Sequence, residues 1–218
     1  VRTAFLLLLL LPFTLLAQPG PPPIGAWREH LPYQSTTTVT ASPNKIFAAT
    51  PYSILGVDVP TGEVQRLSKI TGLSATGIST ISFDPFANKL IVAYTNSNID
   101  IISEGRIANV PGLMRAGITG DKTVYHMLPT PSYIYLSTGL GVLLLDAAKN
   151  EIKESWFIGN GGQYVKVNMF AAGTQYFYAA TEQGLKRIAT SNTNPANYSN
   201  WQSITSTPCK GVVSFQNK

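Results

Sequence analysis

Cysteine is almost missing from this chain of 218 residues, which contains only Cys209. An internal disulfide is therefore excluded, and the core has to be stabilised by packing alone. Charged residues are also scarce, at 12% of the sequence, whereas helical bundles usually carry many Glu and Lys on their exposed faces. The low charge favours an exported β protein over a helical bundle.

Residues with catalytic or metal-binding chemistry are few. The two histidines, His30 and His126, do not have the spacing of a metal-ligand pair. The Gly-x-Ser-x-Gly element of serine hydrolases is absent, and residues 159–162 lack the Lys and Ser or Thr of a phosphate-binding loop. Basic residues are scattered, so the formal net charge of +5 does not indicate nucleic-acid binding. The sequence predicts no enzyme, no cofactor, no metal site and no catalytic residue.

The first 17 residues have the pattern of a secretory signal peptide. Arg2 provides the positive charge, Leu6 to Leu16 the apolar run, and Ala17 a small residue before cleavage. The run is short and interrupted by Pro12, which argues against a membrane span. The alternative is an uncleaved N-terminal anchor, and a lipid anchor is not expected because no cysteine follows Ala17.

An internal repeat is the strongest signal in the sequence. Four apolar segments begin at Ile46, Leu90, Ile134 and Phe177, so their starts are 44, 44 and 43 residues apart. Each segment is followed by a short turn and a second apolar run, and each is preceded by another β-prone run. This period is typical of four-stranded propeller blades. Helical repeats of similar length are disfavoured because the apolar segments have only about five residues and end at turn residues.

The sequence therefore predicts an all-β fold, a partial β-propeller of four-stranded antiparallel blades with four blades and the start of a fifth at residues 211–215. We expect the inner strands at the continuous apolar runs and the outer strands at more polar segments. The predicted organisation is a signal peptide (1–17), an N-terminal segment (18–35) and the partial propeller (36–218). Because an open stack of blades leaves unpaired strand edges, we expect the chain to be the beginning of a longer protein.

Three tryptophans are expected to have structural roles. Trp27, Trp156 and Trp201 each precede the first strand of the following blade by a similar distance. Trp27 thus resembles an outer-strand residue without a blade of its own, and residues 24–31 are expected to supply the strand that closes the ring. Alternatively, Trp27 plugs one end of the core.

Polar residues near strand ends are the remaining site candidates. Asp58, Asp100 and Asp146 recur at such positions, and we expect each of them to cap a turn. Asn96, Asn98 and Asp100 form the densest polar cluster, which is a possible contact for a hydroxylated ligand, an ion or a partner. Calcium is disfavoured there because the run lacks the Asp and Gly pattern of calcium loops.

Several strings in the sequence resemble the PorZ family, a β-propeller component of the type IX secretion system. They are Trp27-Arg-Glu-His-Leu-Pro-Tyr33, Arg66 to Ser74, the run from Asn88 to Asp100, and Gly139 to Leu143 followed by Glu151 and Gly159. The resemblance implies a non-enzymatic protein that is exported to the periplasm and then to the outer-membrane surface. It further implies two propellers and a C-terminal β-sandwich, in a complex with the sortase PorU and the barrel-associated PorV and PorQ. That complex attaches cargo proteins to anionic lipopolysaccharide.

Two other functions remain open from the sequence. Residues 72–74, Gly-Leu-Ser, also occur in the periplasmic ligand-sensing propellers of hybrid two-component regulators. A propeller lyase or glycosidase is the other alternative, and it requires clustered histidines or carboxylates at the central channel.

Overall fold

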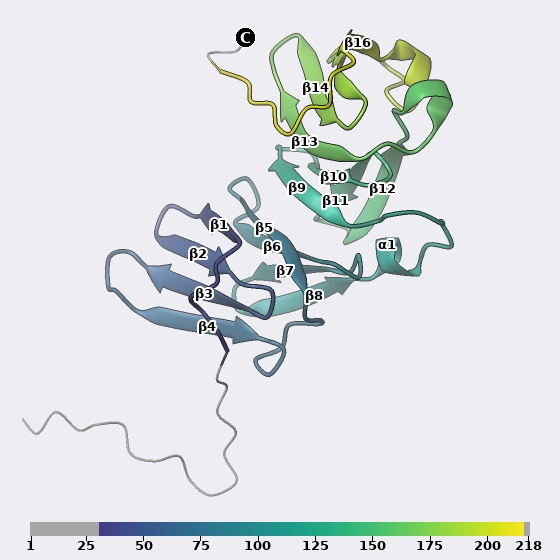
Figure 1. The fold of residues 1–218 in the computed structure, drawn as a ribbon. Coiled ribbons are helices and arrows are strands. Elements are labelled where there is room, and N and C mark those ends of the chain that lie inside the picture. The colour runs from purple at the N-terminus through teal and green to yellow at the C-terminus, as the bar shows by residue number, and fades with distance from the viewer. Residues whose placement is uncertain (1–30, 216–218) are drawn as a thin grey trace, which may run out of the picture. The chain divides into compact units, whose positions relative to one another are not determined.

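The computed structural model describes residues 31–215, and within them sixteen strands form four antiparallel sheets of four strands each (Figure 1). The strands of each sheet follow chain order, so each sheet is one blade. Blade 1 contains β1 (Thr38–Ala41), β2 (Lys45–Ala49), β3 (Ser53–Asp58) and β4 (Val64–Ser68). Blade 2 contains β5 (Ile78–Asp84), β6 (Lys89–Tyr94), β7 (Ile99–Ser103) and β8 (Arg106–Val110). Blade 3 contains β9 (Val124–Pro129), β10 (Ile134–Thr138), β11 (Val142–Asp146) and β12 (Glu151–Trp156). Blade 4 contains β13 (Val167–Ala172), β14 (Tyr176–Thr181), β15 (Gly184–Ala189) and β16 (Gln202–Thr205).

Helical structure is limited to short turns between strands. The helix α1 (Gly112–Arg115) lies between blades 2 and 3, η2 (Asn160–Gly162) lies between blades 3 and 4, and η3 (Tyr198–Asn200) precedes β16. No helix in residues 31–215 is long and apolar enough to cross a membrane.

The predicted repeat is confirmed strand by strand. Ile46, Leu90, Ile134 and Phe177 lie on β2, β6, β10 and β14, the second strands of the four blades. Each of them faces an apolar residue of the third strand in the register, namely Val57, Ile102, Leu145 and Ile188. The all-β fold of propeller blades predicted from the period is therefore correct.

The blades pack face to face through three apolar clusters. First strands of successive blades lie next to each other, β1 beside β5, β5 beside β9 and β9 beside β13. Phe47 and Ile54 of blade 1 pack with Val92 of blade 2, and blade 3 contributes to one cluster on each of its faces. Neighbouring blades thus bury apolar faces against each other, as repeat architectures do, whereas Val39 and Ile46 of blade 1 remain exposed.

The continuous apolar runs form the two middle strands of each blade. All five residues of β10 are buried, as are four of the five in β11, whereas β1 and β9 contain many partly exposed residues. A middle strand has a hydrogen-bonded neighbour on both edges and a packed sheet on its faces, which explains its apolar sequence. The outer strands β4, β12 and β16 are mostly exposed, as the sequence predicts.

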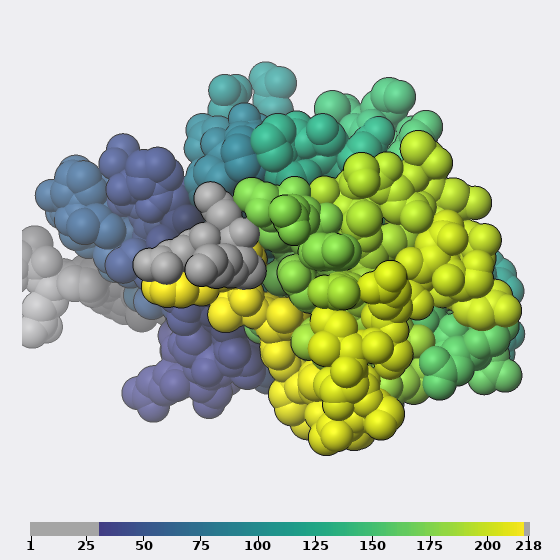
Figure 2. All heavy atoms as spheres, turned by 90° about the horizontal axis from the view of Figure 1, so that it is seen from above, coloured from purple at the N-terminus to yellow at the C-terminus, as the bar shows by residue number. Residues whose placement is uncertain are grey.

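Residues 211–215, predicted as the start of a fifth blade, contain no strand. They continue a segment that is anchored beside blade 4, since Cys209 N donates to Thr181 O (2.9 Å) and the Asn168 side chain donates to Cys209 O (2.8 Å). Figure 2 shows this segment, in yellow, at the surface beside the green atoms of blade 4. Val213 and Phe215 are 79% and 73% exposed, so they contribute nothing to the core of the described residues. The fifth blade stays a prediction.

The predicted signal peptide, Trp27 and nearly all of the proposed ring-closing segment lie outside the described residues.

Candidate functional site on the connector face

The antiparallel order of each blade brings two sets of loops to one end of the sheets. We call this end the connector face; it comprises the connectors 69–77, 111–123, 157–166 and 206–215 and the turns between second and third strands. Backbone hydrogen bonds join the two sets, because Gly77 N donates to Pro51 O (2.8 Å) and Thr95 N donates to Gly77 O (2.7 Å). Equivalent bonds run from Val165 to Leu140 and from Glu182 to Lys166. Backbone hydrogen bonds therefore join the connectors 69–77, 157–166 and 206–215 to neighbouring turns of this face.

A buried threonine fixes three of the four turns on this face. The hydroxyl of Thr50, Thr138 or Thr181 donates to the carbonyl three residues later, over 3.3, 2.9 and 2.7 Å. Blade 2 has Tyr94 at the corresponding position, and its hydroxyl instead donates to Asp100 (2.6 Å). Blade 2 thus departs from the repeat at Tyr94, and this tyrosine contacts Asp100 of the polar cluster that the sequence predicts as a contact site.

Asp100 is fully buried in the middle of β7, and its carboxylate accepts three hydrogen bonds from protein groups. The donors are Tyr94 Oη (2.6 Å), Ser74 N (2.8 Å) and Asn109 Nδ2 (2.9 Å). Burial and the neighbouring carboxylate raise the pKa of Tyr94 far above its usual range, so its hydroxyl stays a donor. Asp100 therefore ties the connector between blades 1 and 2 to the interior of blade 2.

The expectation that three aspartates cap turns is correct for two of them. Asp58 accepts from the backbone of Thr61 and Asp146 from that of Ala148. For Asp100 it is wrong, because the residue lies within a strand and accepts from side chains and from a distant connector. The sequence pattern of strand ends did not distinguish the two situations.

The other two residues of the predicted contact cluster, Asn98 and Asn96, differ in their exposure to solvent. Asn98 is 4% exposed, and its side-chain oxygen accepts from Asn109 (3.0 Å). Asn96 is exposed in the turn, where its side chain accepts from Asn98 N (3.0 Å). A ligand contact by Asn96, Asn98 and Asp100 stays a prediction, and of the three only Asn96 lies at the surface.

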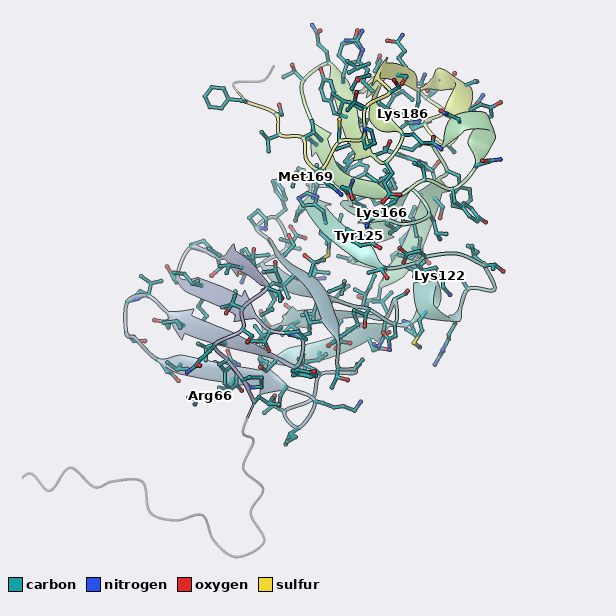
Figure 3. All side chains as sticks on the ribbon, in the orientation of Figure 1. Arg66, Lys122, Tyr125, Lys166, Met169 and Lys186 are labelled. Carbon is teal, nitrogen blue, oxygen red and sulfur yellow. The ribbon has the colours of Figure 1, made fainter. Side chains whose placement is uncertain are left out.

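Lys186, a residue that the sequence reasoning missed, holds the corresponding place in blade 4. It is 5% exposed on β15, and its ammonium donates to Ile158 O (2.8 Å) and Asn160 Oδ1 (2.9 Å) of the connector between blades 3 and 4. Burial lowers the pKa of Lys186. Figure 3 shows this side chain within blade 4.

Asp100 and Lys186 occupy one structural slot of the repeat. The residues of this slot pair in the register with Ala48, Val92, Leu136 and Ala179, and those of blades 2 to 4 lie on the side of the preceding blade. In blades 1 to 4 the slot holds Leu55, Asp100, Leu143 and Lys186. An alignment of the four repeats places Asp100 and Lys186 at a position where the other two repeats have leucine. The sequence therefore contained a signal that distinguishes these two charged residues.

An open hollow of about 460 Å³ lies on the connector face between blades 3 and 4. Its polar groups come from two connectors, from the start of β9 and from a turn, and they contact one another. The Tyr125 hydroxyl donates to Asp121, the Lys166 ammonium lies 4.0 Å from the centre of the Tyr125 ring, and Lys166 is 3.8 Å from Glu182. Figure 3 shows Tyr125 and Lys166 beside each other. Tyr164, which is 46% exposed, adds an aromatic ring to the lining.

The same contacts determine the ionisation states of Tyr125 and Asp121 in this hollow. Burial and the hydrogen bond to Asp121 raise the pKa of Tyr125 to about 12. Burial alone would raise the pKa of Asp121, but hydrogen bonds from Tyr125 and Thr123 and the nearby charge of Lys166 outweigh it, and the pKa is lowered. At neutral pH the hollow therefore presents a neutral phenol beside an ionised carboxylate.

Basic residues predominate along the connector face. The connectors carry Lys69, Arg115, Lys122, Lys166 and Lys210. Against these stand Asp121 in a connector and Glu182 in a turn. The surplus of positive charge makes this face suited to a negatively charged surface or partner.

Trp156 and Trp201 pack between and beside the blades. Trp156 is 2% exposed at the end of β12 and Trp201 is 8% exposed before β16, with ring centres 6.2 Å apart. Trp156 also contacts the rings of Tyr135 and Phe170, which face each other across blades 3 and 4. Both rings belong to the apolar cluster between blades 3 and 4, and the structural role expected for the tryptophans stays a prediction.

Within residues 31–215 no group of three or more His, Cys, Asp or Glu side chains is arranged to hold a metal ion.

Comparison by sequence gives one family. The profile described as the N-terminal β-propeller domain of PorZ from the type IX secretion system matches residues 46–202. No curated protein matches the chain by sequence.

Comparison by structure gives relatives with the same fold. One is PorZ of Porphyromonas gingivalis, described as an essential bacterial surface component of the type IX secretion system, with a TM-score of 0.70 and 26% identity. The match covers 83% of this chain and 24% of the PorZ chain, so the chain spans about a quarter of that protein. The extracellular domain of a putative hybrid two-component system from B. thetaiotaomicron has a TM-score of 0.65 and 14% identity, covering 84% of this chain and 25% of the other. AztD of Citrobacter koseri has a TM-score of 0.56 and 13% identity, covering 82% and 49%.

Proposed function

The chain belongs to the family of PorZ N-terminal β-propeller domains, and we propose that it acts as a non-enzymatic module of a type IX secretion system at the bacterial surface. The match over residues 46–202 carries this proposal, because it includes most of the four blades. The likeness to the P. gingivalis protein, which is described as a surface component, supports the same location.

We further propose that the intact protein belongs to a cell-surface attachment complex. Its partners there are the sortase PorU and the barrel-associated PorV and PorQ, and the complex links cargo proteins to anionic lipopolysaccharide. The physical support is the connector face, on which basic residues outnumber acidic ones and three of the four connectors are bonded to neighbouring turns. A surplus of positive charge on one face attracts an anionic surface.

The alternative function, ligand sensing for a hybrid two-component regulator, has weaker support. The extracellular domain of such a protein is similar in fold, but at 14% identity the likeness concerns the fold alone. No residue of the connector face favours the sensor function over the secretion function.

The proposal is tested by binding of the full-length protein to purified anionic lipopolysaccharide, measured by biolayer interferometry. A basic residue near an anionic surface contributes about 1 kcal/mol, so Lys166→Glu and Lys210→Glu should each weaken binding by at least about fivefold. Raising the salt concentration should weaken binding further. Lys149→Glu, an exposed change in the β11–β12 turn at the opposite end of the blades, is the matched control.

Equal binding by the connector variants and the control would contradict the assignment of this face. Equal binding to lipopolysaccharide that lacks its anionic groups would contradict the proposed partner.

A further inference from the structure

A second hollow lies at the end of the blades opposite to the connector face. It is about 380 Å³ in volume and opens between blades 1 and 2, among the turns that join first to second and third to fourth strands. Its floor is apolar and includes Phe47, Phe83 and Leu90. A volume of this size with an apolar floor and a few polar groups is typical of sites that take a side chain or a small molecule.

The corresponding gap between blades 2 and 3 contains a smaller hollow of about 120 Å³, which a lysine crosses. Between blades 2 and 3, the Lys89 ammonium at the start of β6 donates to Ala147 O (2.7 Å) in the β11–β12 turn. In the repeat, Lys45 corresponds to Lys89 and Glu104 corresponds to Ala147. Here both residues line the hollow, and its volume is about 380 Å³ against about 120 Å³ in the gap that Lys89 crosses.

The rim of the hollow carries more negative than positive charge. Asp58 and Glu104 are on the rim with Lys45, and Glu63 lines a smaller hollow that shares Lys45 and Asp58. Hydrogen bonds from Thr61 lower the pKa of Asp58, and the charge of Lys45 acts in the same direction. Since the whole chain has a formal net charge of +5, this acidic rim is a local exception.

The tight turn between β7 and β8 positions Glu104 on the acidic rim. Glu104 and Gly105 have φ values of 49° and 76°, the positive pair that a tight two-residue hairpin requires. Such hairpins match the twist of their strands and leave little freedom at the turn. Glu104 is therefore presented at the mouth of the hollow by a rigid element.

We propose that this hollow binds a segment of a partner polypeptide in which an apolar side chain is followed by Lys or Arg. The apolar side chain enters between Phe47 and Phe83, and the basic side chain lies against Asp58 and Glu104. Charge complementarity selects a basic rather than an acidic segment, and the hollow, open at the surface, gives an extended peptide access. This site is separate from the connector face, so it does not depend on lipopolysaccharide binding.

The test uses saturation-transfer NMR on the full-length protein with three capped tetrapeptides. The probes are acetyl-Gly-Phe-Lys-Gly-amide, the same peptide with Glu in place of Lys, and the same peptide with Ser in place of Phe. We expect the first to bind at least tenfold more tightly than the other two. Phenethylamine, which has the same ring and charge without a peptide backbone, should bind more weakly than the first peptide.

Two substitutions, each with a control, test whether the peptide binds in this hollow. Gln65→Trp places a large ring at an exposed lining position of β4 and should abolish the signal, whereas Gln202→Trp on β16 should leave it unchanged. Glu104→Lys should weaken binding at least fivefold, against Glu151→Lys as the control for charge.

Equal binding of the Lys and Glu peptides, or a signal unaffected by Gln65→Trp, would overturn the site. Phenethylamine binding as tightly as the peptide would overturn the assignment to a polypeptide segment.

Discussion

Single buried residues attach two of the connectors to the blades that follow them. Asp100 and Lys186 lie in the same slot, are both buried, and each bonds to the connector that precedes its own blade. Leucine fills that slot in the other two blades, and Leu143 packs there in the apolar cluster between blades 2 and 3. A buried charge in a strand is tolerated only when its polar atoms are all bonded, which both residues achieve.

Removing the charge of Asp100 should destabilise the propeller. Asp100→Asn keeps the volume but turns an amide towards donors, and a hydrogen bond to a charged group is worth about 1.5–3 kcal/mol. We expect a loss of about 2–3 kcal/mol in the free energy of unfolding, measured by urea denaturation with tryptophan fluorescence. Glu151→Gln, an exposed change on β12, should stay within about 0.5 kcal/mol. A similar small effect for Asp100→Asn would show that its three hydrogen bonds contribute little.

At the scale of elements, glycine allows the third strand to begin close to the fourth. Gly141 has a φ of 147°, and a Cβ at this position would lie 2.2 Å from Trp156 O of β12. Gly184 repeats the arrangement in blade 4, with Thr205 O at 1.8 Å. The strands can approach this closely because neither residue carries a side chain.

Gly141→Ala should therefore be costly. The backbone conformation alone disfavours alanine by about 1–3 kcal/mol, and the contact with β12 adds to it. We expect the melting temperature to fall by several degrees in differential scanning calorimetry. Gly117→Ala is the matched control, because no atom lies within 4 Å of its added Cβ, and it should leave the melting temperature nearly unchanged. Equal melting of the two variants would contradict the close approach.

At the scale of the whole described molecule, the burial of a strand depends on its position within its blade. The middle strands β10 and β11 are almost entirely buried, whereas only one residue of the outer strand β12 and none of β16 is buried. Blades contact only their neighbours in the sequence, so opening can occur locally.

Amide hydrogen exchange should follow this gradient. Peptides from β6, β10 and β11 are expected to exchange at least tenfold more slowly than peptides from β4 and β12, because their amides are buried and paired on both edges. Mass spectrometry of the full-length protein measures both groups in one experiment. Uniform exchange across each blade would contradict packing in layers.

The sequence was sufficient for the blade architecture because the repeat determines it. Ile46, Leu90, Ile134 and Phe177 carry the period in apolar residues, and apolar periodicity is what packing selects. The functional surface was harder to predict because it depends on residues that break the period. Lys166 of the connector 157–166 lies over the ring of Tyr125 on β9, and their proximity follows from the stacking of blades 3 and 4 rather than from any local motif.

The shared slot of Asp100 and Lys186 has a consequence for how such a protein evolves. Duplicated blades begin as interchangeable units, and an acidic residue in one copy and a basic residue in another end that equivalence. A blade moved to another place in the ring would bring its charge to a connector that lacks the matching acceptors or donors. The slot therefore distinguishes blades 2 and 4 from blades 1 and 3, which both carry leucine there, and exchanging blade 2 with blade 4 should destabilise the protein even though every strand is retained.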